Sequence, residues 1–262
     1  MTWGYGILLR NREAKWKSWQ SSIEVAGKAI GPAIQRPPPR TGGTLNQLII
    51  LGAGGYAQEL LWIVDDLNSQ SPSWDFLGFV DPKSAARKGQ FHYDRPILGG
   101  WDDVPKQTEI YFACGIGSPA SRATECAEAE RRGYKPAALV HPSVIAARHV
   151  QIGEGTVVGA GCILAPYAVL GRHCSLNLGV TIGHNSSMGD YCVLSPGAQL
   201  LGAAKLGERV FLGANATVYQ GRKVGAGSIV GANSFLLTHL GPGASVIGVP
   251  AVQFSHATAT RN

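Results

Sequence analysis

Residues 176–200 read LNLGVTIGHNSSMGDYCVLSPGAQL, and an aliphatic residue or methionine occupies every sixth position. The same spacing runs from residue 140 to residue 236, and only one of its seventeen anchor residues is small. An α-helix repeats every 3.6 residues and a single strand alternates every two, so neither produces a strict period of six. The anchors are Val140, Ala146, Ile152, Val158, Leu164, Leu170, Leu176, Ile182, Met188, Leu194, Leu200, Leu206, Leu212, Val218, Val224, Val230 and Leu236.

This period predicts a parallel β-helix, in which each six-residue edge contains one short strand and the anchors stack inside a prism. Three edges then form one coil of eighteen residues. The fourth residue after an anchor is usually small or β-branched, as at Thr156 and Ala168, which suits a second inward position. The period alone leaves the function open, since such a stack can also be a passive scaffold.

The charge and hydropathy of the chain disfavour several classes of protein. The net charge is +6, but residues 1–40 hold seven Lys or Arg against two Glu, so +5 of it belongs to that segment. We therefore expect no nucleic-acid-binding surface on the rest of the chain. No apolar run approaches the ~20 residues of a membrane span, and residues 1–40 lack a clear signal-peptide core and cleavage site.

The five cysteines form no CxxC pair and no disulfide framework. We expect them to be small buried residues, which suits a reducing cytoplasm. Three fall at the inward position of the hexads, one in a predicted strand and one in a predicted helix: Cys162, Cys174, Cys192, Cys114 and Cys126.

Composition divides the chain into four parts. Residues 1–44 end in a Pro- and Gly-rich linker and are predicted to be a poorly ordered extension. Their Trp, Lys and Arg residues leave a membrane-surface helix as the alternative. An α/β domain over residues 45–139, a β-helix over residues 140–254 and a tail over residues 255–262 follow.

The α/β segment alternates strands and helices. Strands are predicted over residues 48–51, 77–80 and 110–114, and helices over residues 58–68 and 119–132. Such alternation indicates a parallel sheet, whose ligands bind at the carboxyl ends of the strands. Gly54, Asp81 and Gly115 all fall at such ends.

A glycine turn follows the first of these strands. Gly52-x-Gly54-x-x-Ala57 matches the dinucleotide-binding fingerprint, and Asp81 is an acid further along. The segment is too short for two mononucleotide-binding halves, so NAD as a redox cofactor is disfavoured. One nucleotide still fits, with its phosphate at the helix N-terminus and its ribose or base near Asp81. The alternative is that the glycines only permit close packing of strand and helix.

One histidine of the coils differs from the others. We number each hexad from its anchor, which is position one. Among the histidines of the coils, only His184 occupies the third position of a hexad, and Asn185 follows it. Such a histidine can act as a general base in the attack on a thioester, although a surface histidine is commoner. Gly202 lies one coil later and could offer its N–H to an oxyanion. The other histidines of the coils fall on different faces, so no metal site is expected.

From Leu48 to Phe254 the chain resembles bacterial sugar O- and N-acetyltransferases of the sialic-acid O-acetyltransferase and bacillosamine-pathway type. Those enzymes join a small Rossmann-like domain to a left-handed parallel β-helix of hexapeptide repeats, and the resemblance implies this fold and handedness here. The matching stretches are residues 50–56, 78–81, 139–143, 177–184, 195–198 and 248–251.

The resemblance implies a role for particular residues. His184 would be the catalytic base with Asn177 nearby, and members of this family are homotrimers with active sites between neighbouring coils. The nucleotide-sugar would be held by Gly54, Gly55, Tyr56, Asp81 and Gly115. The acetyl-CoA groove would be lined by Val193, Gly202, Ala214 and Ala232.

Two positions depart from the family. Asn185 stands where an acidic residue often orients and strengthens the base, and Val193 stands where some members have a second histidine that contacts CoA. We expect an acetyl-CoA-dependent acetyltransferase acting on a nucleotide-linked amino sugar for a surface glycan. The alternatives are O-acetylation of sialic acid or of serine, and a non-catalytic sugar-nucleotide-binding protein that lost its acid.

Overall fold

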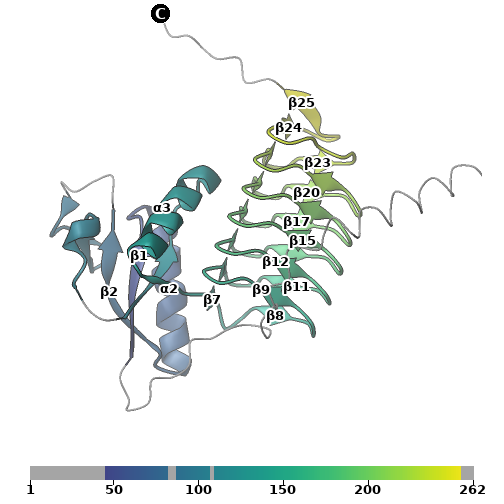
Figure 1. Cartoon of the computed structure of the whole chain (residues 1–262). Coiled ribbons are helices and arrows are strands. Elements are labelled where there is room, and N and C mark those ends of the chain that lie inside the picture. Colours follow the sequence, from purple (N-terminus) through teal and green to yellow (C-terminus); the bar gives the residue numbers. More distant parts are fainter. Residues whose placement is uncertain (1–44, 82–86, 107–108, 255–262) are drawn as a thin grey trace, which may run out of the picture. The chain divides into compact units, whose positions relative to one another are not determined.

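The computed structural model describes residues 45–81, 87–106 and 109–254. These residues form an α/β unit from β1 to β6, followed by stacked coils of short strands from β7 to β25 (Figure 1). The expected extension at residues 1–44 and the tail at residues 255–262 lie outside the described residues. No helix among the described residues is long and apolar enough to cross a membrane.

The α/β unit contains a six-stranded sheet in the order β3-β4-β2-β1-β5-β6. Its strands pair in parallel, except that β3 runs antiparallel to β4. The three predicted strands are confirmed, but the first begins two residues earlier and the second three residues earlier than predicted. The second is extended by the buried Trp74, which packs edge-on against Tyr111. The strands are β1 Asn46–Leu51, β2 Trp74–Val80, β3 Phe91–His92, β4 Arg95–Gly99, β5 Ile110–Cys114 and β6 Lys135–Pro136.

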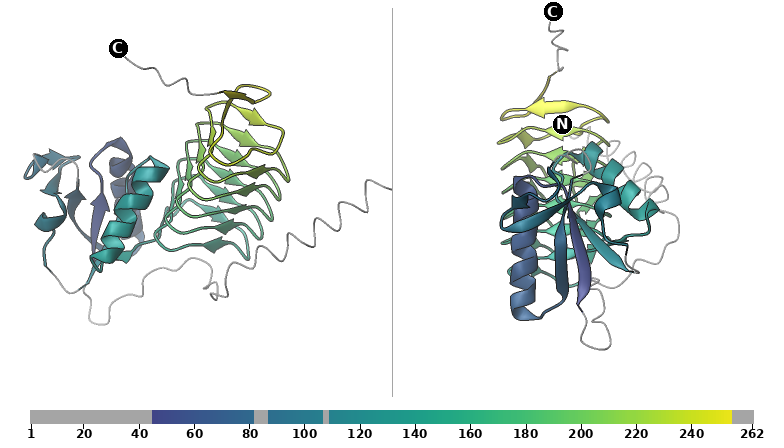
Figure 2. Two further views of the ribbon diagram at one scale, coloured as in Figure 1. Left: turned by 45° about the horizontal axis from the view of Figure 1, so that its top comes forward. Right: turned by 90° about the vertical axis from the view of Figure 1, so that its left-hand side faces the viewer.

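One helix covers each side of this sheet (Figure 2). Leu48 and Ile50 of β1 pack with α2 (Gly55–Gln70), and the alternate residues of β1 pack with α3 (Pro119–Arg131). The first predicted helix therefore begins at the glycine turn itself, three residues before its predicted start. A short 3₁₀ helix, η3 (Trp101–Asp103), lies between β4 and β5.

The coils have three faces, each a ladder of parallel strands. The first face consists of β7 Leu139–Val140, β10 Val157–Val158, β13 Ser175–Leu176, β16 Val193–Leu194, β19 Phe211–Leu212, β22 Ile229–Val230, β24 Ser245–Ile247 and, antiparallel at its end, β25 Val252–Phe254. The second face consists of β8 Ile145–Ala146, β11 Ile163–Leu164, β14 Thr181–Ile182, β17 Gln199–Leu200, β20 Thr217–Val218 and β23 Phe235–Leu236. The third face consists of β9 Gln151–Ile152, β12 Val169–Leu170, β15 Ser187–Met188, β18 Lys205–Leu206 and β21 Lys223–Val224.

The register confirms the eighteen-residue coil. Leu164 pairs with Ile182, and Leu176 pairs with Leu194, so each anchor stacks on the anchor one coil away. The anchors fill a continuous apolar core inside the prism. Ala146 is exposed, contrary to the expectation for an anchor, because it lies in the first coil with a neighbouring coil on one side. The fold is thus a Rossmann-like α/β unit followed by a left-handed parallel β-helix.

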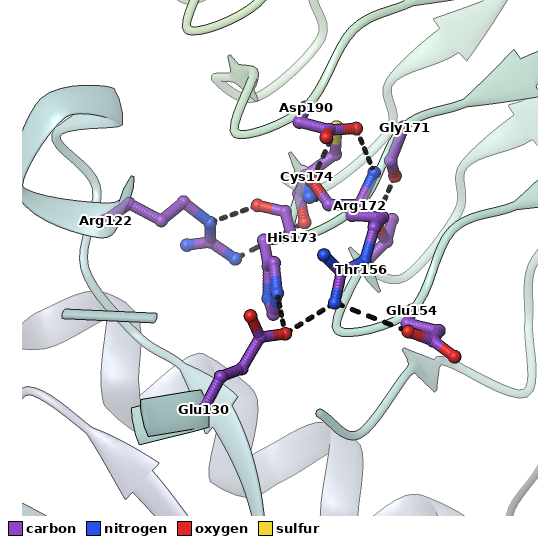
Figure 3. A network of polar contacts seen from close by, with 9 residues as sticks. All are labelled: Arg122, Glu130, Glu154, Thr156, Gly171, Arg172, His173, Cys174 and Asp190. Carbon is purple, nitrogen blue, oxygen red and sulfur yellow. Dashed lines mark hydrogen bonds and ion pairs between the residues drawn. The ribbon is translucent and has the colours of Figure 1, made fainter. Parts of the chain in front are cut away.

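The α/β unit contacts the coils through Arg122 of α3, at the turn that precedes β13. This side chain is fully buried, and its guanidinium donates hydrogen bonds to backbone carbonyls of both parts, as Figure 3 shows for the coil side. Because a buried cation is costly unless its donors are satisfied, these bonds fix α3 on the coil. The acceptors are His173 at 2.6 Å, Cys174 at 3.3 Å, and Cys114 and Ile116 at 2.9 Å each.

His173 is a second contact between the two parts. Its ring is fully buried between Phe112 and Tyr191, with ring centroids 5.7 Å and 5.4 Å away. Its Nε2 bonds to Glu130 at 3.0 Å, and Glu130 also pairs with Arg172 (Figure 3). Burial lowers the pKa of His173, although Glu130 opposes this shift. The five cysteines are free and buried, as predicted.

Candidate functional site

His184 lies at the turn where the second face passes into the third. We call the turns after the three faces the first, second and third corners, so His184 and Asn185 belong to the second corner. Both side chains are exposed. Asn185 has a φ of +58°, in the left-handed region that asparagine tolerates better than most residues.

The imidazole of His184 is held by its neighbour. Its Nδ1 lies 3.0 Å from Asn185 Oδ1, and because a carbonyl oxygen only accepts, Nδ1 carries the proton in this bond. Nε2 is then the nitrogen with a free lone pair. Asn185 can therefore orient the imidazole of His184, as a catalytic role for that histidine requires.

Gly202 packs directly against this ring. A Cβ at residue 202 would come within 2.6 Å of His184 Nε2, so a side chain there would displace the imidazole. Among the described residues no hydrogen bond uses the Gly202 N–H. The predicted base and the predicted oxyanion donor are thus brought together at the second corner.

The glycine turn lies at the carboxyl ends of β1, β2 and β5. Gly52 adopts a φ of +89° and bonds to Val80 at 2.7 Å, which explains a glycine at that position. Gly54 is the N-cap of α2, and at Gly54 and Gly55 nothing lies within 4 Å of the position that a Cβ would take. The first turn of α2 contains no acidic residue, so no carboxylate of that turn competes with an anion for this helix N-terminus.

Two further residues flank this turn and were missed from the sequence. Arg87 Nη1 lies 3.1 Å from the Ala53 carbonyl and 3.5 Å from Asp81 Oδ2. His92 Nε2 donates to the Gly54 carbonyl at 3.1 Å. Neither residue belongs to a motif, and the sheet alone brings them to the turn from β3 and the segment before it.

Gly115 is part of the same edge of the sheet but contacts the protein itself. A Cβ there would lie 2.8 Å from Ala57 Cα and 3.1 Å from the Leu51 carbonyl. Its lack of a side chain allows β5 to approach α2, which is the packing explanation considered for these glycines.

Tyr56 and Glu59 connect α2 to the first face of the coils. Tyr56 Oη bonds to Ser175 Oγ at 2.5 Å, and burial raises the pKa of Tyr56 to about 12. Burial also raises the pKa of Glu59, and a hydrogen bond from Asn177 opposes that shift. Asn177 Oδ1 accepts from the Leu178 N–H at 2.6 Å. The Tyr56 hydroxyl and the Asn177 amide are therefore both engaged within the protein.

The expected acetyl-CoA residues fall at two corners. Val193 is buried on the first face, and Ala214 and Ala232 lie on successive coils at the first corner, where Ala232 contacts Gly213. Gly202 lies at the second corner with His184. Asn177 and the two alanines therefore lie at the first corner and His184 at the second. Within one chain, the second face lies between these two corners.

No group of three His, Cys, Asp or Glu side chains in the described ranges could hold a metal ion.

Two family models match parts of the chain. The PglD N-terminal domain matches residues 47–128, and the hexapeptide repeat of succinyl-transferase matches residues 204–238. No curated protein matches the chain significantly in sequence.

Solved structures match both parts together. A variant of perosamine N-acetyltransferase from Caulobacter crescentus, in complex with CoA and GDP-perosamine, is 26% identical with a TM-score of 0.71, covering 81% of this chain and 98% of that one. The acetyltransferase domain of PglB from Neisseria gonorrhoeae is 24% identical with a TM-score of 0.71, covering 80% and 100%. WeeI from Acinetobacter baumannii is 22% identical with a TM-score of 0.68, covering 80% and 100%.

The family matches span the glycine turn and the later coils, and the structural matches extend over both. Together these matches identify the chain as a hexapeptide-repeat sugar acetyltransferase of the PglD type, an acetyl-CoA-dependent acyltransferase.

Proposed function

We propose that the enzyme acetylates the amine of a nucleotide-linked amino sugar destined for a surface glycan, with His184 as general base. The observation that carries the proposal is the contact between His184 Nε2 and Gly202, with Nδ1 held by Asn185. The similarity to perosamine N-acetyltransferase in complex with GDP-perosamine supports a nucleotide-sugar as acceptor.

The chemistry follows from this geometry. The acceptor nitrogen attacks the thioester carbonyl while His184 Nε2 takes a proton from it. The carbonyl oxygen gains negative charge, which the Gly202 N–H can stabilise. When the intermediate collapses, the C–S bond breaks, and the imidazolium can return the proton to the departing CoA thiolate. Asn185 orients the ring but supplies no negative charge to the imidazolium.

We assign the nucleotide to the glycine turn. Its diphosphate would meet the open N-terminus of α2 at Gly54 and Gly55, where the helix dipole favours an anion. Arg87 adds a positive charge beside that position, and Asp81 would bond the ribose or the base. Tyr56 and Gly115 contribute indirectly, since the hydroxyl of Tyr56 and the bare Cα of Gly115 hold α2 in place.

The distribution of residues over the corners supports a homotrimer. The glycine turn belongs to the unit that packs on the first face, while His184 and Gly202 lie at the second corner. A neighbouring copy that placed its second corner against the first corner of this chain would unite the sugar, His184 and the groove at Val193, Ala214 and Ala232. We propose this arrangement and a cytoplasmic location, where acetyl-CoA and nucleotide-sugars are made.

A thiol-release assay tests the proposal. The enzyme would be supplied with acetyl-CoA and a panel of UDP-, GDP- and dTDP-linked amino sugars, with free sialic acid and serine as alternative acceptors. We expect release with an amino sugar and a loss of about 10²–10⁴-fold in kcat for His184→Ala. Rates for His184→Ala within about threefold of the unsubstituted enzyme would remove His184 from the reaction.

A further inference from the structure

Glu59 of α2 carries a carboxyl group whose two oxygens differ in their contacts. Its Oε2 is buried and has no hydrogen-bond partner among the residues that the structure describes. The hydrogen bond from Asn177 therefore goes to the other oxygen, Oε1. Burial raises the pKa of Glu59, because the charged form loses hydration there. Burying a polar atom without a partner costs free energy, so stability alone does not explain a glutamate at this position.

Asn177 is held at both ends of its side-chain amide. Its Oδ1 accepts a hydrogen bond from the Leu178 N–H at 2.6 Å, and its Nδ2 donates to Glu59. Its backbone is fixed as well, because its N–H donates to the Leu194 carbonyl at 2.9 Å and its carbonyl accepts from Cys162 Sγ at 3.1 Å. The orientation of the amide is therefore set before any substrate binds.

The Oδ1 atom of Asn177 can accept a second hydrogen bond. A carbonyl oxygen has two lone pairs, and among the described residues the Leu178 N–H uses one of them. Asn177 is only partly buried at the first corner, which leaves access to the residue from outside. The amide therefore offers a fixed hydrogen-bond acceptor at that corner.

One face of α2 connects the glycine turn to Glu59. Gly55 and Glu59 are four residues apart in the helix, so they lie on the same face, one turn of about 5.4 Å apart. A diphosphate at Gly54 and Gly55 can therefore direct its sugar along this face. The sugar then approaches Asn177, which Glu59 contacts from the helix.

We propose that Glu59 is a positioning residue, which holds the Asn177 amide so that its oxygen receives an N–H of the acceptor amine. The inference rests on the proposed function, in which a neighbouring copy places its second corner against this first corner. A neutral amine has two N–H groups and one lone pair. Asn177 Oδ1 accepts one N–H, and His184 of the neighbouring copy takes the other proton, which leaves the lone pair directed at the thioester carbon.

This arrangement also favours one class of acceptor. A hydroxyl group has a single O–H, which His184 needs for the attack, so a hydroxyl leaves Asn177 Oδ1 without a hydrogen-bond donor. A site built around two acceptors therefore suits an amine better than a hydroxyl.

The test separates the activity of Glu59 variants from their stability. Glu59→Met keeps a long side chain that suits a helix but removes the acceptor, whereas Glu59→Gln keeps an oxygen that can accept from Asn177. With an amino sugar, we expect Glu59→Met to lower kcat about tenfold and Glu59→Gln to stay within about threefold of the unsubstituted enzyme. The melting temperature of Glu59→Met should not fall, because the unpartnered buried oxygen is removed. A lower melting temperature with an unchanged kcat would show a purely structural role and overturn the proposal.

A double-mutant cycle shows whether Glu59 acts through Asn177. The kcat would be measured for the unsubstituted enzyme, Glu59→Met, Asn177→Ala and the double variant. Glu59→Met should lower kcat about tenfold when Asn177 is present and less than about twofold when it is absent. Equal factors in the two backgrounds would overturn the assignment, because Glu59 would then act independently of Asn177.

Asp66→Ala is the matched control. Asp66 lies about two turns further along α2, and its carboxylate also bonds to the coils, at 2.8 Å from His141 Nε2. This variant removes a carboxylate contact between α2 and the coils without touching Asn177, so kcat should stay within about twofold of the unsubstituted enzyme. A decrease as large as that of Glu59→Met would assign the effect to the packing of α2 and refute the role of Glu59.

Thiol release separates this inference from the proposed function. Absence of release with every amino sugar would refute the proposed function, and the acceptor amine at Asn177 with it. Release with an amino sugar, together with equal kcat values for the unsubstituted enzyme and Glu59→Met, would refute the role of Glu59 and leave the proposed function in place.

Discussion

His184 and Asn185 are joined by a hydrogen bond of 3.0 Å between Nδ1 and Oδ1, and the left-handed backbone of Asn185 makes it possible. Adjacent residues of a strand point to opposite sides, but the corner turns both side chains outward. The bond fixes the tautomer of the imidazole and directs Nε2 toward Gly202. The side chain of Asn185 is neutral, so it does not stabilise the imidazolium as a carboxylate does.

Asn185→Asp should supply that charge. Aspartate also tolerates a positive φ, so the turn should survive, whereas the longer side chain of Asn185→Glu fits the turn less well. We expect higher activity, or an acid limb of the kcat/KM profile displaced to higher pH because the ring holds its proton more strongly. The measurement is a pH–rate profile of the unsubstituted enzyme, Asn185→Asp and Asn185→Ala. Three superimposable profiles would show that residue 185 does not tune the base.

Gly202→Ala should lower kcat at least tenfold without unfolding the coil. The added Cβ would lie 2.6 Å from His184 Nε2, so the ring must move away from the reacting position. Gly241→Ala is the control, because nothing lies within 4 Å of its Cβ position on another turn of the coils. Equal kcat values for the two variants would mean that the ring needs no contact with residue 202.

Gly54→Val should raise the KM of the sugar substrate about tenfold and leave that of acetyl-CoA unchanged. Gly54 has an extended backbone, with φ −100° and ψ −177°, and open space around its Cβ position, so valine fits the fold. Its side chain would occupy the space assigned to the diphosphate. If the KM of acetyl-CoA rose instead, the division of substrates between the α/β unit and the coils would be reversed.

Stability should fall as the pH drops through the ordinary titration range of histidine. Burial lowers the pKa of His173 in the folded protein, so the unfolded chain takes up the proton first as the pH falls through about 6.5. The free energy of unfolding is therefore fully retained above that pH and decreases below it. His173→Asn, which keeps a residue suited to a φ of +52°, should show a flatter dependence between pH 7 and pH 5.

His149→Asn is the control for that measurement. His149 occupies the same hexad position with a φ of +64°, but its ring is stacked on Tyr167 at the second corner and is exposed. Thermal unfolding of both variants across this pH range should separate them. If the pH dependence of unfolding became flatter to the same extent in both variants, the effect would not be specific to the buried ring of His173.

The sequence by itself determined the coils. A period of six requires neighbouring anchors to stack eighteen residues apart, and Leu176 on Leu194 follows from that repeat without any long-range information. The outward position of His184 and the nearness of Gly202 follow from the same arithmetic. The glycine turn at Gly54 was equally local, since the strand, the turn and the helix are contiguous in the chain.

Tertiary structure alone decided what lies beside these motifs. Arg87 and His92 reach the glycine turn because β3, β4 and β2 pair side by side, and strand order is not encoded in a local pattern. Arg122 contacts the coil carbonyls of residues 173 and 174, some fifty positions away, because packing of α3 brings them together. Hexad spacing fixes which residues stack, but the positions of side chains between separate elements depend on how those elements pack.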